Sequence, residues 1–476
     1  MSKRLAKRVL RRFLGSAAQG RPPAPEYWGL SRTAAGDVSL DGVTLRQLAQ
    51  EWGSPLHIVN ARRLRENAGR FLAVPAGRRA GCEVYYSYKT NPIAGVLQEL
   101  HALGVGAEVI SHYELWLALQ LGVPPERIVF NGPGKSDASI RQAIDAQIQL
   151  LNVNHREEIA RVGRIAGELG RRPRIGVRIT VGLGWAGQFG VPVAGGLALQ
   201  AYEEALRVAS LDVVGLHAHR GGMIRSRDDL TAFVLAVLSF VDELHRRTGR
   251  SLQVLDFGGS LATPTVRGLS TRELRLNRAL QRELEPADPA RALGIDEYVS
   301  VLTGLVEDFY DRRRWPRPRI VVETGRAITG DAQMLLTSVL TVKSEPARTF
   351  LVLDAGINLA ESCRSEYHAL LPVTDAKRPG GGVYTVVGPI CTPGDTLYWA
   401  ARLPSLNAWD SLLIMDAGAY FVPFATSFSF PQPPIVMVDG EKVTLLRRGE
   451  RFEDLAQRDL AAAKAAGAGT TPGADR

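Results

Sequence analysis

Eight short apolar segments, separated by longer amphipathic stretches, recur between residues 83 and 326 of this 476-residue chain. Each is rich in β-branched or aromatic residues and several end in Gly, Pro or Asn, which is typical of strands. A strand, a helix and a further strand, repeated, predict parallel strands with crossover helices. The segments are 83–89, 106–111, 127–133, 150–154, 174–180, 213–219, 252–259 and 319–326.

Eight such units favour an α/β fold with a closed (β/α)8 barrel of the TIM type. A doubly wound open sheet is the alternative. It usually has fewer strands and a glycine-rich first turn, which is missing here. After residue 330 the pattern changes to strands joined by turns, which predicts an all-β domain.

The segment 34–60 reads as strand, short helix and strand, so it can join the later strands in a discontinuous β domain. Residues 260–294 form a polar, arginine-rich insertion, which we expect over the C-terminal face of the barrel. The predicted division is a basic extension (1–24), a β domain (25–60 and 331–454), a barrel (61–330) that carries the insertion (260–294), and a flexible tail (455–476).

Several classes of protein are disfavoured by composition. No run approaches ~18 apolar residues, so we expect no transmembrane helix, and the first residues lack the apolar core of a secretion signal. The three cysteines, Cys82, Cys363 and Cys391, are too sparse for a disulfide framework and fit a cytoplasmic protein. No CxxC or HExxH spacing occurs, so we expect no metal site of these kinds.

The net charge of +9 is concentrated at one end, because residues 1–20 hold six of the cations and no acid. A nucleic-acid-binding protein is expected to spread a basic face over its folded part, so we expect no nucleic-acid partner. Two interpretations of the extension stay open. It is either a solvated terminus or a basic amphipathic helix that docks on a membrane surface or an acidic partner.

Lysine is rare in this chain, with eight residues among 58 cations, so a lysine in a special place is expected to serve for its amine. Catalytic groups of such barrels lie at the C-terminal ends of the strands. An amine, carboxylates, a histidine, a glycine pair and an arginine there suit pyridoxal phosphate, which needs a Schiff-base amine, a partner for its ring nitrogen and donors for its phosphate. The residues at these ends include Lys89, Glu108, Arg178, His219, Gly258, Gly259, Ser260, Glu323, Gly325 and Arg326.

Six motifs in order resemble those of the fold type III pyridoxal-phosphate decarboxylases, which include diaminopimelate, ornithine and arginine decarboxylases. They are YYSYKTNP, GLHAHRGG, DFGGS, ETGR, GPICTPGD and GAYF. Each motif is weak alone, but six in the same order are specific, and the resemblance runs from about residue 35 to 445. It implies an alanine-racemase-like barrel with a C-terminal β domain and decarboxylation of an amino acid through a Schiff base and a quinonoid.

The resemblance also implies roles at the cofactor. Lys89 would hold it as a Schiff base, His219 would stack on its ring, and Glu323 would keep the ring nitrogen protonated. Arg178 would lie close to the ring on the substrate side. The residues expected at its phosphate are Gly258, Gly259, Gly325, Arg326 and Tyr420, and the cofactor set also includes Glu108 and Ser260.

The resemblance further implies a homodimer with shared active sites, in which the partner subunit's Cys391 protonates the reacting carbon. We therefore expect Lys89, His219 and Cys391 to be catalytic. The residues expected at the substrate are Arg364, Tyr367, Thr392 and Asp395.

One departure bears on the substrate. Thr392 and Pro393 follow Cys391, where the family usually has an acid that addresses the far amino group of diaminopimelate. Because a threonine cannot form that ion pair, we expect an amino acid other than diaminopimelate, or a conjugated or carrier-linked amino acid. Two alternatives stay open: a racemase or epimerase on the same fold, and a non-catalytic binding protein of decarboxylase shape.

Overall fold

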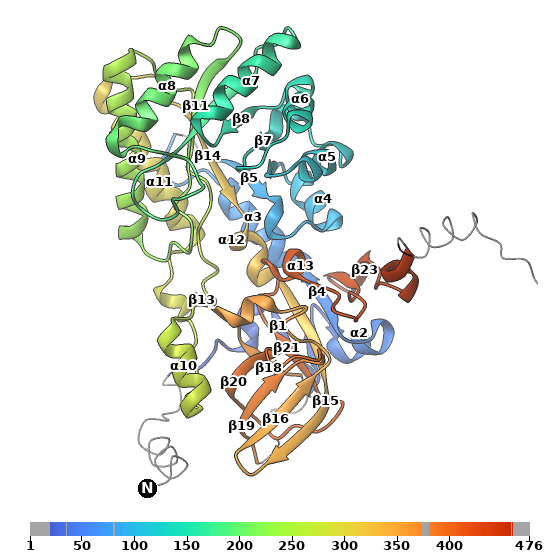
Figure 1. Ribbon diagram of the computed structural model, residues 1–476. Coiled ribbons are helices and arrows are strands. Elements are labelled where there is room, and N and C mark those ends of the chain that lie inside the picture. Colours follow the sequence, from blue (N-terminus) through green and yellow to red (C-terminus); the bar gives the residue numbers. More distant parts are fainter. Residues whose placement is uncertain are drawn as a thin grey trace, which may run out of the picture.

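The computed structural model describes residues 20–459 apart from positions 35, 80, 374–377, 379 and 458. The amphipathic helix considered for residues 1–20, and most of the tail expected at 455–476, lie outside the described residues. Figure 1 shows a helix-covered barrel next to a β-rich domain. Among the helices of this described part, none combines the length and the apolar character needed to cross a lipid bilayer.

Eight parallel strands close into a ring, which confirms the predicted (β/α)8 barrel. The ring closes because β14 pairs with β5 and β8 pairs with β9. The strands are β5 (Glu83–Ser87), β6 (Gly106–Val109), β7 (Ile128–Phe130), β8 (Leu150–Val153), β9 (Arg174–Thr180), β11 (Asp212–Ala218), β12 (Val254–Asp256) and β14 (Arg319–Thr324), with the short β10 (Val191–Pro192) beside β9.

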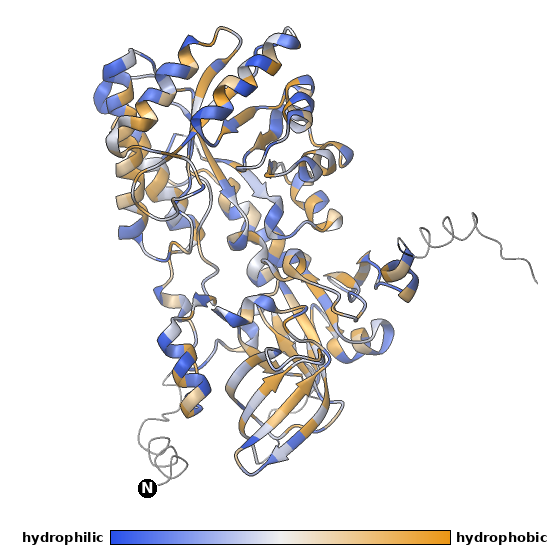
Figure 2. Cartoon of the chain, viewed as in Figure 1, coloured by the Kyte–Doolittle hydropathy of each residue, from blue (hydrophilic) through white to orange (hydrophobic). Residues whose placement is uncertain are grey.

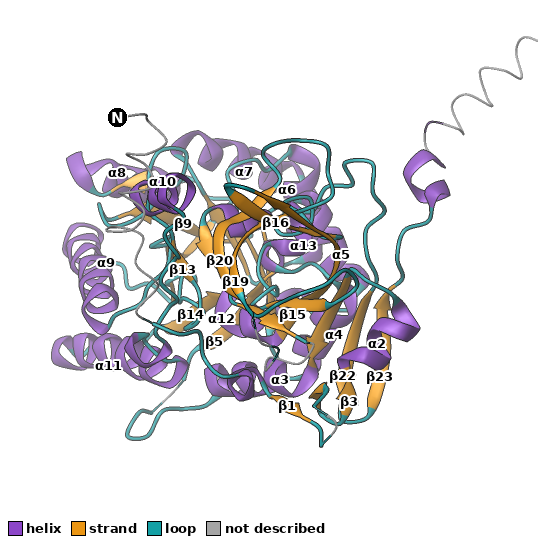
Figure 3. Ribbon diagram, turned by 90° about the horizontal axis from the view of Figure 1, so that it is seen from below, coloured by secondary structure: helices purple, strands orange, loops and turns teal. Residues whose placement is uncertain are grey.

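Successive side chains of these strands point to opposite sides, so each strand serves two cores. Tyr85 and Val129, for example, fill the inside of the barrel, while their neighbours Val84 and Phe130 pack outward against the helices. This explains why the strands are apolar on both faces. The helices around them alternate polar and apolar residues (Figure 2) and surround the strands (Figure 3).

The covering helices begin at capping residues that the sequence provides. Ser111, Ser136 and Ser226 each accept a hydrogen bond from the backbone N–H three residues on, which satisfies a free donor of the first turn. The helices are α3 (Ala61–Leu72), α4 (Ala94–Ala102), α5 (His112–Gln120), α6 (Asp137–Ala146), α7 (Arg156–Glu168), α8 (Leu197–Arg207), α9 (Arg227–Thr248) and α11 (Ile295–Arg313).

The β-rich domain is organised around β15 (Gln333–Glu345), which pairs with β4 (Leu56–Asn60), β16 (Arg348–Leu353) and β21 (Ser411–Ile414). The strand β4, which comes early in the chain, thus lies between β15 and β22, which both follow residue 330. The predicted residue limits of the domains stay a prediction. The other elements here are β18 (Leu370–Pro372), β19 (Gly382–Val387), β20 (Thr396–Leu403), β22 (Ile435–Asp439), β23 (Lys442–Arg447), and the N-terminal β1 (Leu30–Arg32), β2 (Val38–Leu40), β3 (Val43–Thr44) and α2 (Leu45–Trp52).

The insertion 260–294 leaves the C-terminal end of β12 and then docks on the β-rich domain. Its strand β13 (Arg267–Gly268) pairs with β17 (Glu366–Tyr367). Its helix α10 (Thr271–Leu280) places the buried Asn277 against β20, where the side chain accepts from Trp399 N–H (3.1 Å). The insertion therefore links the barrel to the second domain.

Candidate active site

A cavity of about 780 Å³ lies between the C-terminal ends of the barrel strands and the β-rich domain. The β-rich side contributes the short helices η7 (Glu361–Arg364) and α13 (Phe421–Phe424) and the strand β17. The structure brings most of the predicted cofactor residues together in this lining: Lys89, Glu108, Arg178, His219, Ser260, Glu323, Gly325, Arg326 and Tyr420.

Lys89 lies in the turn η2 (Tyr88–Thr90), directly after β5. Its Nζ donates to Glu108 Oε2 at 2.6 Å and also to Ser87 Oγ. Burial alone would lower the pKa of Lys89, but Glu108, Tyr420 and Glu323 together outweigh it and the pKa is raised. The amine is thus held as a cation beside a fully buried carboxylate that can accept its proton.

Glu323 ends β14 and lies in a buried polar network. Asn131 Nδ2 donates to its Oε1, and His217 Nε2 lies 3.4 Å from its Oε2. Burial raises the pKa of the adjacent Asp256 well above its ordinary value, and this carboxyl donates to Glu323. Burial alone would also raise the pKa of Glu323, but His217 and the hydrogen bonds lower it. The proton therefore stays on Asp256 and the negative charge on Glu323.

His219 is oriented by the turn after β12. Gly259 N–H donates to its Nδ1 at 3.2 Å, so Nε2 carries the ring proton and faces Ser260 Oγ at 3.1 Å. Burial lowers the pKa of His219 well below its ordinary value, which is consistent with a neutral ring. The indole of Trp185 lies 5.6 Å from this ring, between centroids.

Three predicted glycines lie where no side chain fits. A Cβ on Gly258, which has φ of +61°, would lie 2.2 Å from His219 Nδ1. A Cβ on Gly259 would lie 2.2 Å from the backbone oxygen of Glu323, and one on Gly325 would lie 2.1 Å from Thr90 Oγ1. Only glycine allows the backbone to come so close to these groups.

Two arginines face the cavity. The guanidinium of Arg178, on β9, lies 4.7 Å from the centre of the Phe189 ring, and its buried Nε has no hydrogen-bond partner in the described part of the chain. Arg326, at the start of α12 (Arg326–Thr329), lies 4.9 Å from the Tyr420 ring. It binds both carboxylate oxygens of Glu366, at 2.7 and 2.9 Å.

The residues expected at the substrate do not line this cavity. Tyr367 packs in the β-rich domain, because it follows Glu366 on β17 and adjacent strand residues face opposite ways. Arg364 turns outward to Glu361 (3.1 Å). The lining from this segment is instead Glu361, Ser362, Ser365 and Glu366.

Cys391, Thr392 and Asp395 also lie outside the cavity of their own chain, in the turn between β19 and β20. The Cys391 thiol is exposed. Asp395 is buried, and its oxygens accept from Ile357 N–H (2.8 Å) and Ile390 N–H (2.9 Å), which fixes the turn.

The sequence interpretation missed His217, Asp256 and Glu366. A position in the site could have been predicted for His217, because it lies two residues before His219 in the same predicted strand segment and so points to the same side. Asp256 had a weaker one, at the end of the seventh strand. Glu366 had none, since its approach to Arg326 spans 40 residues of chain.

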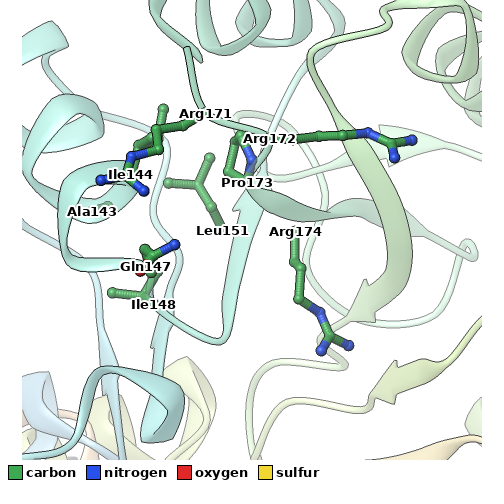
Figure 4. A pocket seen from close by; sticks show the side chains of 9 residues that line it. All are labelled: Ala143, Ile144, Gln147, Ile148, Leu151, Arg171, Arg172, Pro173 and Arg174. Carbon is green, nitrogen blue, oxygen red and sulfur yellow. The ribbon is translucent and has the colours of Figure 1, made fainter. Parts of the chain in front are cut away.

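A second, smaller cavity of about 250 Å³ lies near the start of β8 and β9, at the end of the barrel opposite to Lys89. Figure 4 shows the side chains that line it. That end of such barrels serves stability rather than catalysis. Its lining is Ala143, Ile144, Gln147, Ile148, Leu151, Arg171, Arg172, Pro173 and Arg174.

The larger cavity fits pyridoxal phosphate. It offers an amine, an ionised carboxylate for a ring nitrogen, a neutral histidine ring, and close-approaching glycine backbone beside an arginine. His217, His219 and Glu323 hold donor atoms within 4.8 Å of one another and could also hold a metal ion. Since His219 and Glu323 are groups expected at the cofactor ring, we treat the cluster as part of one cofactor site.

Comparison with known proteins agrees with this geometry. Residues 73–330 match the family of pyridoxal-dependent decarboxylases, in its pyridoxal binding domain. The chain is 32% identical over 432 residues to the diaminopimelate decarboxylase of Methanothermobacter thermautotrophicus, covering 88% of this chain and 95% of that one. It is 29% identical over 441 residues to the diaminopimelate decarboxylase of Aquifex aeolicus, covering 89% and 96%.

Solved structures are similar over the same extent. A crystal structure of a protein from Aquifex aeolicus superimposes with a TM-score of 0.77 and 28% identity, covering 91% of this chain and 98% of that one. The diaminopimelate decarboxylase of Helicobacter pylori complexed with L-lysine gives a TM-score of 0.74 and 25% identity, covering 88% and 99%.

These relatives correct one expectation. The missing acid at Thr392 predicted a substrate other than diaminopimelate, and this prediction is wrong, because relatives near 30% identity over most of the chain carry the name diaminopimelate decarboxylase. The error came from treating one position of the sequence as decisive for the substrate. The family match, together with the cavity that contains Lys89, shows that the chain belongs to the pyridoxal-dependent decarboxylases. It is a carboxy-lyase that uses pyridoxal phosphate to decarboxylate an amino acid.

Proposed function

We propose that this enzyme decarboxylates diaminopimelate. The observation that carries the proposal is the cavity that joins Lys89, Glu323 and His219, in a chain whose relatives of nearly full length are diaminopimelate decarboxylases. A free amino acid is the simpler substrate. A carrier-linked substrate has no observation in its favour among the described residues. A cytoplasmic location rests on the sequence alone.

When bound, pyridoxal phosphate supplies an aldehyde that condenses with amines and a protonated ring that accepts the electrons of the breaking Cα–carboxylate bond. Lys89 would hold the aldehyde carbon until the substrate amine takes its place. Glu108, at 2.6 Å, would accept the proton that Lys89 must lose before its nitrogen can react.

Glu323 would hold the ring nitrogen in its protonated form, because a buried anion favours a nearby cation. Neutral His219 would stack on the ring without adding a competing positive charge. The backbone N–H of Gly325, which lines the cavity, would bind the phosphate, with Arg326 as its cation. Gly258 and Gly259 do not line the cavity, and the Gly259 N–H is bonded to His219 instead. Asp256 and His217 help to hold Glu323 ionised.

We also propose a homodimer in which the partner subunit's Cys391 donates the proton that replaces carbon dioxide on Cα. The support is geometric: the thiol is exposed, lies outside its own chain's cavity, and stands on a turn fixed by Asp395. A positioned proton donor contributes roughly 10²–10⁴-fold to the rate.

The test is release of carbon dioxide from diaminopimelate, lysine, ornithine and arginine by the enzyme loaded with pyridoxal phosphate. Diaminopimelate should be turned over with the highest kcat/KM, and Lys89→Ala should fall to the uncatalysed background, since no other lysine is among the described residues that line the cavity. An enzyme that shows the absorbance of bound cofactor but releases no carbon dioxide from diaminopimelate would refute the proposal.

A further inference from the structure

One wall of the cavity comes from the β-rich domain and carries Glu366. Its side chain is 15% exposed and lines the cavity on β17, opposite the ends of the barrel strands. The strand is held in place by the insertion, because Gly268 pairs with Glu366 and Leu269 N–H donates to Ser365 O at 2.7 Å. The carboxylate is therefore fixed by two chain segments that are far apart in sequence.

Glu366 is ionised and has acceptor capacity left. Arg326 donates one hydrogen bond to each carboxylate oxygen, whereas the two oxygens together can accept about four hydrogen bonds. His368, fully buried, lies 3.6 Å from the same group through Nε2. Burial alone would raise the pKa of Glu366, but His368 and Arg326 outweigh it and the pKa is lowered.

The other carboxylates of the lining are committed elsewhere. Glu108 binds Lys89, and Glu323 lies in the network expected at the cofactor ring. Burial raises the pKa of Glu114 to about 7, and its oxygen accepts from Ile110 N–H. Glu361 is 41% exposed and pairs with Arg364. Among the lining residues, Glu366 is the buried anion away from the reactive amine.

The proposed substrate places a second ammonium at its far end. With its reacting carbon beside Lys89, the far end of the molecule would lie in the rest of the cavity, whose lining on the β-rich side includes Glu366. A desolvated ammonium needs an anion, and Thr392 supplies none. We propose that Glu366 binds the distal ammonium of the substrate and so selects diamino acids with a charged far end. This inference rests on the proposed function.

The ion pair with Arg326 holds the Glu366 carboxylate in place. Arg326 itself starts the barrel helix α12 and is the cation proposed for the cofactor phosphate, so Glu366 is the group of this pair that is left for the far end of the substrate. A substrate whose far end has a carboxylate but no amine would leave one acceptor site of the buried Glu366 carboxylate without a hydrogen-bond donor, which costs binding energy.

The experiment compares diaminopimelate with 2-aminopimelate, which keeps the far carboxylate and lacks the far amine. Glu366→Gln should raise KM for diaminopimelate roughly 10–100-fold, the size expected for a lost hydrogen bond to a charged group, with kcat changed only a few-fold. KM for 2-aminopimelate should stay within about threefold. Glu366→Asp keeps the charge and should recover part of the loss.

Glu361→Gln is the matched control, because it neutralises the neighbouring, half-exposed carboxylate of the same wall, and it should raise KM for diaminopimelate less than about threefold. The visible absorbance of bound pyridoxal phosphate gives a readout independent of turnover. Titration with either amino acid should shift that absorbance, and Glu366→Gln should weaken the diaminopimelate titration alone.

Two results would overturn the inference. One is an equal loss for both amino acids in Glu366→Gln. The other is a loss of cofactor affinity that accounts for the whole defect, which would make Glu366 a positioning residue for Arg326. If wild-type enzyme binds diaminopimelate in the titration but releases no carbon dioxide from it, the proposed function fails, while the titrations of the variants still decide the role of Glu366.

Discussion

At the level of single residues, carboxyl groups of similar depth carry different charges. Glu323 is an anion because His217 and Asn131 surround it, while burial keeps its neighbour Asp256 protonated. Asp416 is a third case. It accepts from Trp28 Nε1 and Thr265 Oγ1, both at 2.8 Å, yet its Oδ2 has no partner within the described residues. Partners, rather than depth alone, decide which carboxyl stays charged.

A prediction about pH follows for Asp416, whose pKa burial raises to about 6. The folded state keeps a proton that the unfolded state loses near pH 4, so this group lowers the free energy of unfolding as pH rises from about 4 to 6. The loss is about 3 kcal/mol. Asp416→Asn removes the titrating group. Chemical denaturation from pH 4 to 7 should therefore show the free energy of unfolding of the variant rising relative to that of the wild type by about 3 kcal/mol. A difference independent of pH would contradict this.

At the level of elements, the insertion acts as a brace. Its strand β13 fixes β17, which carries Glu366, and its helix α10 fixes β20 through Asn277. The sequence indicated an arginine-rich segment over the barrel mouth, but only its first residues, Ser260 and Leu261, line the described cavity. The helix α10 docks on the β-rich domain instead, because Asn277 is buried against backbone groups of β20. The arginines of α10 therefore lie at the surface.

Asn277→Ala should weaken this docking. The change leaves Trp399 N–H without its partner and costs about 1–3 kcal/mol. Chemical denaturation should show lower stability, and limited proteolysis should cut faster within residues 268–288. Arg275→Ala, on the exposed face of the same helix, is the control and should change stability by less than about 0.5 kcal/mol. Equal effects of the two variants would show that α10 is not held by Asn277.

At the scale of the whole molecule, the cavity opens where the two domains meet, and the proposed proton donor stands outside it on the β-rich domain. Exposed aromatic side chains occur at this cavity and next to it in the chain: Tyr113 on α5 and Phe424 at the end of α13 line it, Trp116 stacks on Tyr113, and Phe428 and Phe430 follow α13. An apolar surface of this kind fits a face that a second copy covers.

Mixed dimers test the shared site. Lys89→Ala and Cys391→Ala should each be nearly inactive alone. When the two are mixed and allowed to exchange subunits, half of the dimers carry one intact site, so activity should rise to about a quarter of wild type. Each variant incubated alone is the control. No recovery, with exchange verified by differently tagged subunits, would mean that Lys89 and Cys391 do not act across subunits.

The sequence by itself determined the architecture and the cofactor. Eight apolar segments at regular spacing predict a closed barrel, since each strand must be covered by the helix that follows it. Residues at strand ends, such as Lys89, His219 and Glu323, converge for the same topological reason, so their meeting in one cavity was predictable from local pattern.

Only the tertiary structure decided which groups form hydrogen bonds with one another and which line the same side of the cavity. Glu366 meets Arg326 because β13 and β17 pair, and Asp256 keeps its proton because it is fully buried and lies beside the charged Glu323. Such contacts depend on distances between segments far apart in the chain, which no local periodicity encodes. Charge, proton position and the recognition of the far end of a substrate are set by those distances, because electrostatic energies in a buried site change steeply with separation.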